Sequence, residues 1–259
     1  MTATSELATR LLQLHRDETL LTVVNVWDVI TARVVADVPG TTALATASHS
    51  IAAMLGYEDG EHIPVDEMLA AVKRVVDSTD LPVTADLEGG YGDAAGTIRR
   101  AVGLGVVGAN IEDQLKPVAE ATRQIEQIMD AVEAEGVPDF VLNARTDAFV
   151  RGGERDRRVI IDDVLERGRA YLDAGAPAYF VPGVLREEEV EELVAAFGPQ
   201  RLTMIGIPGN PSLERLEQLG VARVSWGPMS QNVALTALQE LVEEIGRGGE
   251  VPASMRMLN

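Results

Sequence analysis

Cysteine does not occur in this chain of 259 residues, and histidine occurs three times. The lack of cysteine excludes disulfide bonds, thiolate metal ligands and cysteine nucleophiles. Long apolar runs are missing too. Charged residues interrupt the first 24 residues, where a signal peptide would need an apolar stretch, and no run long enough to span a membrane follows. We therefore expect a cytoplasmic protein.

Positively charged side chains are outnumbered almost two to one, with 22 Lys and Arg against 41 Asp and Glu and a net charge of −19. A field of this sign repels nucleic-acid phosphates and anionic lipids, so we expect neither nucleic acid nor a membrane as a partner. A protein of this charge that handles an acidic substrate must offset its own field locally, with a cation or a few placed arginines. The composition therefore favours a metal-dependent site.

Eight short apolar runs recur along the chain, each followed by an amphipathic helical pattern. Their nearly continuous apolar character predicts strands buried on both faces of a parallel sheet. Repeated strand–helix units over such a length are typical of a single α/β barrel. We predict one (β/α)8 TIM-barrel domain over residues 1–259, with strands within 20–27, 41–47, 82–87, 106–111, 139–144, 178–181, 202–207 and 222–226.

Helices are predicted where apolar residues recur every three or four positions, as in 65–78, 121–136 and 186–198. An extra helix is expected over 3–16, ahead of the first strand, and a last helix over 229–247. Glycine is a common helix stop signal, because it adopts the left-handed backbone conformation easily. Four glycines stand in such places, shortly after a helical stretch and before the next strand: Gly136, Gly175, Gly198 and Gly220.

Acidic side chains follow the third and fourth predicted strands, and the active site of such a barrel lies at the carboxyl ends of its strands. Asp86 and Glu88, two residues apart at an extended strand end, would point to the same side, and Glu112 ends the neighbouring strand. An all-oxygen pocket suits Mg²⁺, or Mn²⁺, better than Zn²⁺. The alternative is that these carboxylates cap helices or are solvated. Three on adjacent strands favour the metal.

Arg145 follows the fifth strand and should point over the mouth of the barrel. A guanidinium group beside a metal suits a substrate with two anionic groups, because it binds a carboxylate in bidentate fashion. The alternative is an internal ion pair with Glu112 or Asp147, and both arrangements are compatible with a substrate-free protein. Among the histidines, His49 falls at a strand end and is the candidate for contact with substrate.

Three segments, ADLEGGYG at 85–92, NIEDQ at 110–114 and NARTDAF at 143–149, resemble the isocitrate lyase/phosphoenolpyruvate mutase superfamily. Further likeness at 55–59 and 220–228 extends the resemblance over most of the chain. It implies a (β/α)8 barrel, Mg²⁺, and cleavage or rearrangement of C–C or P–C bonds in small 2-oxo or 2-hydroxy acids through an enolate.

The resemblance also implies roles for individual residues. Asp86 would bind the metal directly, Glu88, Glu112 and Asp59 would act largely through water, and Arg145 would hold the substrate. Lyases of the family bind substrate through the backbone amides of a Ser-Gly-Gly segment, which corresponds to the segment that begins at Ala47 and Ser48 here. Trp27, Asp59 and Asn210 complete the predicted substrate site. His49 and Tyr91 are the side chains that could supply a proton.

One departure from the family pattern limits the activities that can be expected. Isocitrate and methylisocitrate lyases carry a catalytic cysteine in a loop after the Glu-Asp-Gln motif, and mutases carry an Asn-bearing gating loop there. In this chain Gln114 is followed by Leu115-Lys116-Pro117 and then by a helical pattern. Decarboxylation of an oxaloacetate-like acid needs no such loop.

Three functions therefore remain open. The first is an Mg²⁺-dependent lyase, decarboxylase or hydrolase acting on an oxaloacetate-like acid. The second is a family member that has lost catalysis and binds a small dicarboxylate, and the third is a phosphonate mutase or hydrolase. The resemblance also implies a homotetramer whose last helices exchange between subunits, and the tail over 251–258 offers apolar side chains for such contacts.

Overall fold

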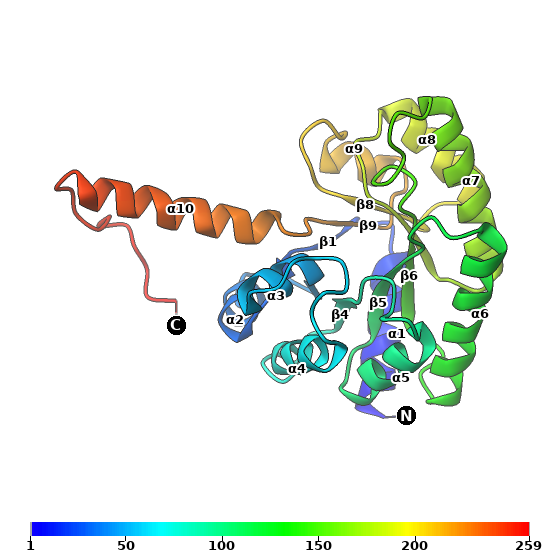
Figure 1. Ribbon diagram of the computed structural model, residues 1–259, viewed down its shortest axis with the longest axis horizontal. Helices are drawn as coiled ribbons and strands as arrows, with labels where there is room; N and C mark the ends of the chain where they lie inside the picture. Colours follow the sequence, from blue (N-terminus) through cyan, green and yellow to red (C-terminus); the bar gives the residue numbers. More distant parts are fainter. Residues whose placement is uncertain (1, 259) are drawn as a thin grey trace.

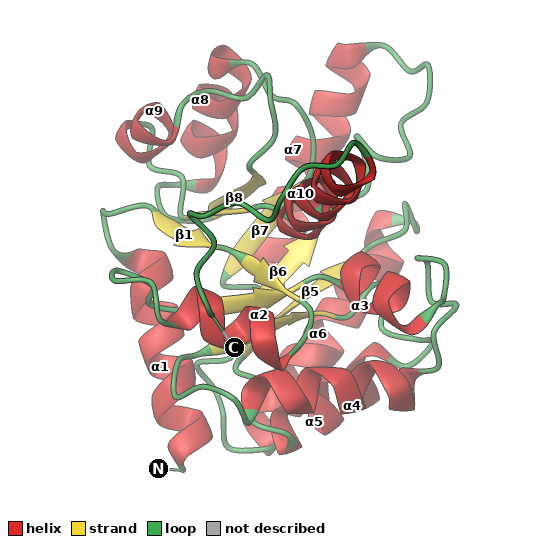
Figure 2. Ribbon diagram, turned by 90° about the vertical axis from the view of Figure 1, so that its left-hand side faces the viewer, coloured by secondary structure: helices red, strands yellow, loops and turns green. Residues whose placement is uncertain are grey.

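The strands form one parallel sheet that closes on itself, as seen in a computed structural model that describes residues 2–258 (Figures 1 and 2). Along the sheet the order is β1-β9-β8-β7-β6-β5-β4-β3-β2, and every neighbouring pair is parallel. The strands are β1 (Leu21–Val23), β2 (Asn25–Val26), β3 (Leu44–Thr46), β4 (Val83–Asp86), β5 (Gly108–Glu112), β6 (Val141–Arg145), β7 (Ala178–Val181), β8 (Leu202–Ile205) and β9 (Arg223–Ser225).

The barrel closes within the first predicted strand. The structure divides the run 20–27 into β1, which pairs with β9, and β2, which pairs with β3. Val24 separates the two segments and belongs to neither. Six of the eight predicted runs contain their strands, whereas β5 and β6 each extend one residue beyond theirs, to Glu112 and Arg145. The predicted TIM-barrel fold is confirmed.

Helices surround the barrel, as Figure 2 shows around the central strands. The predicted helix over 3–16 is α1, and the predicted last helix ends one residue earlier than expected, at Gly246. The four glycines proposed as stop signals all have positive φ, between 76° and 100°. The helices are α1 (Ala3–Arg16), α2 (Val29–Ala36), α3 (Ser48–Leu55), α4 (Val65–Val76), α5 (Ala94–Gly103), α6 (Val118–Ala134), α7 (Arg157–Asp173), α8 (Glu187–Phe197), α9 (Leu213–Gln218) and α10 (Met229–Gly246).

Helix α1 covers the amino-terminal end of the barrel. Its Leu11 fills the space left by Gly108 at the start of β5, where an added Cβ would lie 2.8 Å from the leucine Cδ2. The same face of α1 buries His15, whose Nδ1 lies 2.9 Å from the Leu11 carbonyl oxygen. This packing closes one end of the barrel and leaves the carboxyl ends of the strands as the open end.

Helix α10 extends away from the barrel (Figure 1), and along its length Gln231 is the residue that the barrel buries. No helix within residues 2–258 is both long and apolar enough to span a bilayer. The interior of the barrel, by contrast, is packed with apolar side chains from all parts of the sheet. The strand ends opposite α1 are therefore held on a rigid frame.

Candidate functional site

Asp86 is the acidic residue that ends β4, and it is anchored by the start of α3. Its Oδ2 accepts hydrogen bonds from the Ser48 backbone N–H at 3.3 Å and from the Ser48 hydroxyl at 2.9 Å. Its Oδ1 is buried and has no hydrogen-bond partner within the protein. The carboxylate is thus fixed through one oxygen, while the other is desolvated and unsatisfied, an arrangement that calls for a ligand because unpaired buried polar atoms are unfavourable.

Glu88 is also buried, but the backbone turns before it. β4 ends at Asp86 and Glu88 has a φ of 53°, so the extended-strand geometry expected for these two residues does not apply. The Tyr91 hydroxyl donates to Glu88 Oε1 at 3.0 Å, and the Glu61 backbone N–H donates to Oε2. Burial raises the pKa of the Glu88 carboxyl to about 6, although these two hydrogen bonds oppose the shift.

The loop before α4 contacts the half of the mouth that carries Asp86 and Glu88, which we call the acidic half. The side chain of Glu61 accepts from the Tyr91 backbone N–H at 2.5 Å, so the 58–62 and 88–91 segments hold each other. Asp59 lies in the same loop, with its Oδ1 3.4 Å from the Ser48 hydroxyl. The Ser48 hydroxyl thus contacts both Asp59 and Asp86, so these two carboxylates lie near each other. Their negative charges act with burial to raise the pKa of Glu88.

Arg145 at the end of β6 forms two ion pairs. Its Nη1 lies 3.0 Å from Glu112 Oε2, and its Nη2 lies 2.8 Å from Asp147 Oδ1. Burial alone would lower the pKa of the guanidinium, but the charges of Glu112 and Asp147 raise it. Burial raises the pKa of Glu112 to about 7 against the opposing effect of Arg145. The internal ion pairs considered from the sequence are therefore both present.

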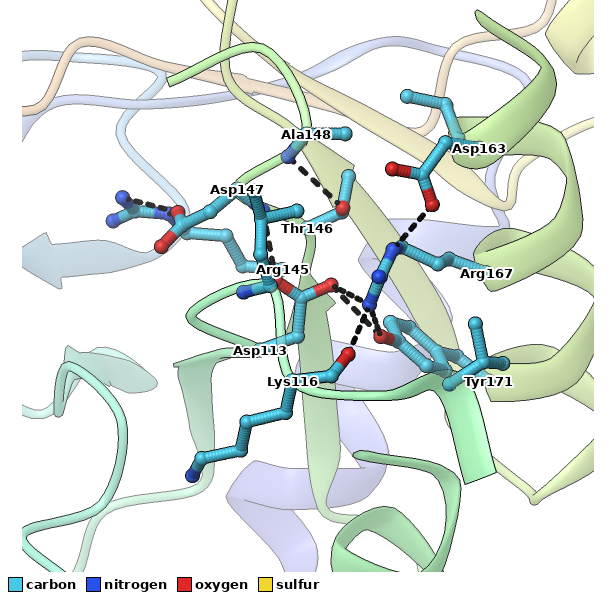
Figure 3. A network of polar contacts seen from close by, with 12 residues as sticks. Asp113, Lys116, Arg145, Thr146, Asp147, Ala148, Asp163, Arg167 and Tyr171 are labelled. Carbon is cyan, nitrogen blue, oxygen red and sulfur yellow. Dashed lines mark hydrogen bonds and ion pairs between the residues drawn. The ribbon is translucent and has the colours of Figure 1, made fainter. Parts of the chain in front are cut away.

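A buried network stands behind Arg145 (Figure 3). Asp113 Oδ1 accepts the Asp147 backbone N–H at 3.0 Å, and Asp113 Oδ2 accepts the Tyr171 hydroxyl at 2.8 Å and Arg167 Nη1 at 3.1 Å. Arg167 also donates through Nε to Asp163 at 2.6 Å. The network therefore positions Asp147, whose carboxylate binds Arg145.

Arg167 and Tyr171 were not predicted as site residues, although the sequence contains a signal for them. Both lie on the buried face of α7, at the three-to-four-residue spacing of its apolar residues. An arginine on such a face must have buried partners.

Arg223 on β9 is buried in the interior with none of its three guanidinium nitrogens hydrogen-bonded within the protein. Burial lowers its pKa to about 10, and the charge of Asp86 opposes that shift. His15 lies near it from α1, and burial together with the charge of Arg223 lowers the pKa of His15 to about 3. At neutral pH the barrel interior below the mouth therefore contains the charged guanidinium of Arg223 beside the neutral imidazole of His15.

The other predicted site residues have varied places. Ala47 is the buried residue before α3, and His49 is exposed in the first turn of that helix, with no contact that ties it to Asp86. Trp27 lines a recess of about 460 Å³ between α2, α3 and α4, outside the mouth. Asn210 uses both ends of its amide on backbone groups, at Leu185 and Ile205. Roles for these residues stay predictions.

The connection from β5 to α6 is as short as the sequence indicated. β5 ends at Glu112 and α6 begins at Val118. Gln114 in this connection packs so closely on Gly89 that a Cβ there would lie 2.4 Å from the amide nitrogen. A mobile loop that carries a catalytic side chain to the mouth has no place in this segment.

The acidic half fits a divalent cation with one direct protein ligand. Within residues 2–258, no three carboxylate or imidazole side chains converge closely enough to form a fully protein-bound metal site. Mg²⁺ commonly keeps several waters and uses one or two carboxylates. The unpaired Oδ1 of Asp86, with Glu88 and Asp59 near, meets that requirement.

Known proteins resemble the chain over most of its length. The sequence profile of the family described as phosphoenolpyruvate phosphomutase matches residues 11–246. The 2,3-dimethylmalate lyase of Eubacterium barkeri is 30% identical over 83% of this chain and 77% of its own length. The oxaloacetate decarboxylase of Ectopseudomonas mendocina (strain ymp) is also 30% identical, over 85% of this chain and 78% of its own.

Among solved structures, a protein of Burkholderia cenocepacia J2315 named as a candidate phosphonomutase is 40% identical. It superposes with a TM-score of 0.85 and covers 92% of this chain and 99% of its own. The similarity therefore includes the strand-end segments that form the mouth, and it covers relatives named for different reactions.

Proposed function

The chain belongs to the phosphoenolpyruvate phosphomutase family, within the isocitrate lyase/phosphoenolpyruvate mutase superfamily, and from this premise we propose that it is an Mg²⁺-dependent enzyme acting on a small 2-oxo dicarboxylic acid. The reaction is decarboxylation or a related C–C cleavage through an enolate. One observation carries the proposal. Asp86 offers an unpaired buried oxygen on one side of the mouth, and Arg145 offers a guanidinium on the other.

The roles of the residues follow from their contacts. Asp86 would hold the cation through Oδ1, and the hydrogen bond from Ser48 fixes the rotamer of Asp86. Glu88, Glu112 and Asp59 would accept hydrogen bonds from water molecules bound to the cation. When bound, the cation acts as a Lewis acid that favours negative charge on the 2-oxo group. Arg145 would exchange part of its contact with Glu112 for a substrate carboxylate.

Proton delivery is the step for which two groups remain candidates. The Tyr91 hydroxyl donates to Glu88, and burial raises its pKa, so it stays protonated and would be available as a proton donor. His49 is exposed beside Ser48 and would pass a proton to the enolate through water. Loss of CO₂ leaves an enolate that needs one proton, which fits a mouth without a mobile acid loop.

The test is a panel of acids with purified protein and Mg²⁺ or Mn²⁺. We expect a higher kcat/KM for oxaloacetate than for isocitrate or methylisocitrate. Since free Mg²⁺ and oxaloacetate can react in solution, the Asp86→Ala variant and a sample treated with EDTA serve as controls. The reverse order of kcat/KM would rule out the proposal, and binding without turnover of any acid would identify a dicarboxylate-binding protein.

A second candidate is a phosphonate mutase or hydrolase. The relative named as a candidate phosphonomutase is 40% identical, against 30% for the two lyase and decarboxylase relatives. The short β5–α6 connection argues against it, because the family's mutases use a gating loop there. Phosphonopyruvate in the same panel distinguishes the two activities.

We propose further that the protein is a cytoplasmic homotetramer assembled through α10. The helix projects from the barrel, and apolar side chains on it and on the following tail are half or more exposed: Val233, Leu235, Leu238, Val242, Ile245, Val251, Met255, Met257 and Leu258. A second copy of the chain would cover them.

Light scattering at micromolar concentration tests the assembly. The expected mass is that of four chains, and Leu238→Glu should reduce it, while Gln239→Glu on the same helix should not. A wild-type protein that is monomeric under these conditions would contradict the proposal.

A further inference from the structure

A second arginine lies at the mouth beside Arg145. Arg151 follows β6 by six residues, and its Nε donates to Asp147 Oδ2 at 2.9 Å. Its Nη2 lies 3.8 Å from Glu112 Oε1. Asp147 is fully buried and binds Arg145 through its other oxygen, so one carboxylate joins the two guanidinium groups.

The two arginines differ in how much of each side chain is open to solvent. The Arg145 side chain is 19% exposed and lies within the barrel end, whereas the Arg151 side chain is 50% exposed. Within residues 2–258, the Nη1 of Arg151 donates no hydrogen bond to the protein, and the hydrogen bond of this side chain is made through Nε. Arg151 therefore keeps donors available at the rim while its Nε is fixed.

The segment that carries Arg151 is held in place from two sides. The Arg151 backbone N–H donates to the Asp147 carbonyl oxygen at 2.7 Å. Arg155 donates to the Ala148 and Gly152 carbonyl oxygens at 3.0 and 3.2 Å and binds Asp163 on α7 at 2.8 Å. Asp163 also binds Arg167 of the network behind Arg145. These contacts hold the segment that carries the Arg151 guanidinium in place before a ligand binds, which lowers the entropic cost of binding.

The electrostatics of the mouth explain why a second arginine is useful there. Glu112 and Asp147 already pair with the guanidinium of Arg145. A substrate with two anionic groups would bring two further negative charges into a protein of net charge −19. A guanidinium with free donors is suited to bind a carboxylate or phosphonate, through charge-assisted and bidentate hydrogen bonds.

We propose that Arg151 determines specificity by binding the second anionic group of the substrate, the one remote from the 2-oxo acid group. Arg145 and Arg151 bind opposite oxygens of one carboxylate, so the clamp suits a short dianion rather than a long one. This inference rests on the proposed function and adds to it the residue that binds the second anionic group of the substrate.

The test compares two metal-binding probes by calorimetry with the Mg²⁺-loaded protein. Oxalate has no remote anionic group, whereas 3,3-difluorooxaloacetate carries one. We expect Arg151→Gln to weaken binding of 3,3-difluorooxaloacetate by about 10- to 100-fold and to leave oxalate binding unchanged. Arg151→Lys, which keeps the charge, should recover part of the loss. Arg158→Gln is the matched control, because Arg158 is 54% exposed and pairs with Asp162 and Glu192 away from the mouth.

Each result separates this inference from the proposed function. Equal affinities of wild type and Arg151→Gln for 3,3-difluorooxaloacetate, or equal losses for both probes, would overturn the role of Arg151 while the proposed function stands. A wild-type protein that binds neither probe with Mg²⁺ would overturn both. If Arg151→Gln does not fold, the ratio of the two affinities in Arg151→Lys decides, with an unchanged ratio counting against the inference.

Discussion

The two halves of the barrel mouth differ in how completely their charges are paired. On the side of β3 and β4, Asp86 keeps a buried oxygen without a partner in the protein, and Glu88 is held by a tyrosine and a backbone amide. On the side of β5 and β6, Glu112, Asp113 and Asp147 each face at least one guanidinium group. The unpaired half is suited to a cation, and the paired half is organised around arginines that suit an anion.

Removal of Asp86 should have the largest effect, because the unpaired half depends on it. Asp86→Ala is expected to weaken Mg²⁺ binding by at least about 100-fold, since loss of groups outside the direct ligands already weakens binding about 10- to 100-fold. Calorimetry of Mg²⁺ or Mn²⁺ binding measures this. Glu126→Ala, on the exposed face of α6, gives the same change in charge and should bind as wild type does. An unchanged affinity in Asp86→Ala would place the cation elsewhere.

Arg145→Lys tests the paired half. Lysine keeps the charge but cannot bind Glu112, Asp147 and a substrate carboxylate with the planar fork that Arg145 supplies. We expect kcat/KM for the preferred acid to fall by the equivalent of about 1.5 to 3 kcal/mol. Steady-state kinetics at saturating Mg²⁺ provide the measurement. Wild-type kinetics in this variant would exclude bidentate recognition.

His15 makes the stability of the folded protein sensitive to acid. Its pKa is about 3 in the folded protein against an ordinary value of 6.5, so below pH 6.5 the unfolded chain binds a proton that the folded chain does not. Stability should therefore fall as the pH drops from 6.5 towards 3, with this residue contributing about 2 kcal/mol between pH 6.5 and 5.

His15→Leu should lack that contribution, and it also removes the unpaired Nε2. Urea unfolding at pH 7, 6 and 5 compares the two proteins. His62→Gln, an exposed histidine, should keep the wild-type dependence on pH. The same loss of stability in wild type and His15→Leu would disprove the effect.

Tyr171→Phe should have the smallest effect of the four. It removes the hydrogen bond to Asp113 and the contact with Arg167 but leaves Arg167 on Asp113 (Figure 3). A loss of about 1 kcal/mol in the free energy of unfolding is expected, with a decrease in kcat/KM smaller than that of Arg145→Lys. Denaturant unfolding and kinetics measure the two quantities. Tyr57→Phe, whose hydroxyl binds Glu67 at an exposed site, is the control and should change neither.

Local features could be predicted from the sequence because they depend on neighbours along the chain. The eight apolar runs located all nine strands, two of which lie in the first run. Positive φ at Gly136 and Gly198 follows from the ease with which glycine ends a helix. Asp86, Glu112 and Arg145 were expected at strand ends, and the structure has each as the last residue of its strand. The one local argument that did not apply concerned Glu88, because the chain leaves the extended conformation directly after Asp86.

Pairing between distant residues could not be predicted in the same way. Ser48 anchors Asp86 across 38 positions, and Tyr171 reaches Asp113 across 58. From the sequence we considered an ion pair of Arg145 with either Glu112 or Asp147. The structure contains both ion pairs at once. Which hydrogen bonds form depends on the rotation of strands and helices around the barrel, and residue spacing does not encode that rotation.

The sequence by itself determined the barrel, its short β5–α6 connection and the set of charged side chains at the strand ends, since periodicity and turn chemistry act over a few residues. Tertiary structure alone decided which of those charges are neutralised. Burial raises the pKa of Glu88 and Glu112, leaves one oxygen of Asp86 unpaired and isolates Arg223, because desolvation depends on the atoms that surround a group in space. The mouth therefore has one half in which a carboxylate oxygen is unpaired and another in which arginines pair with carboxylates, and this division is a consequence of that packing.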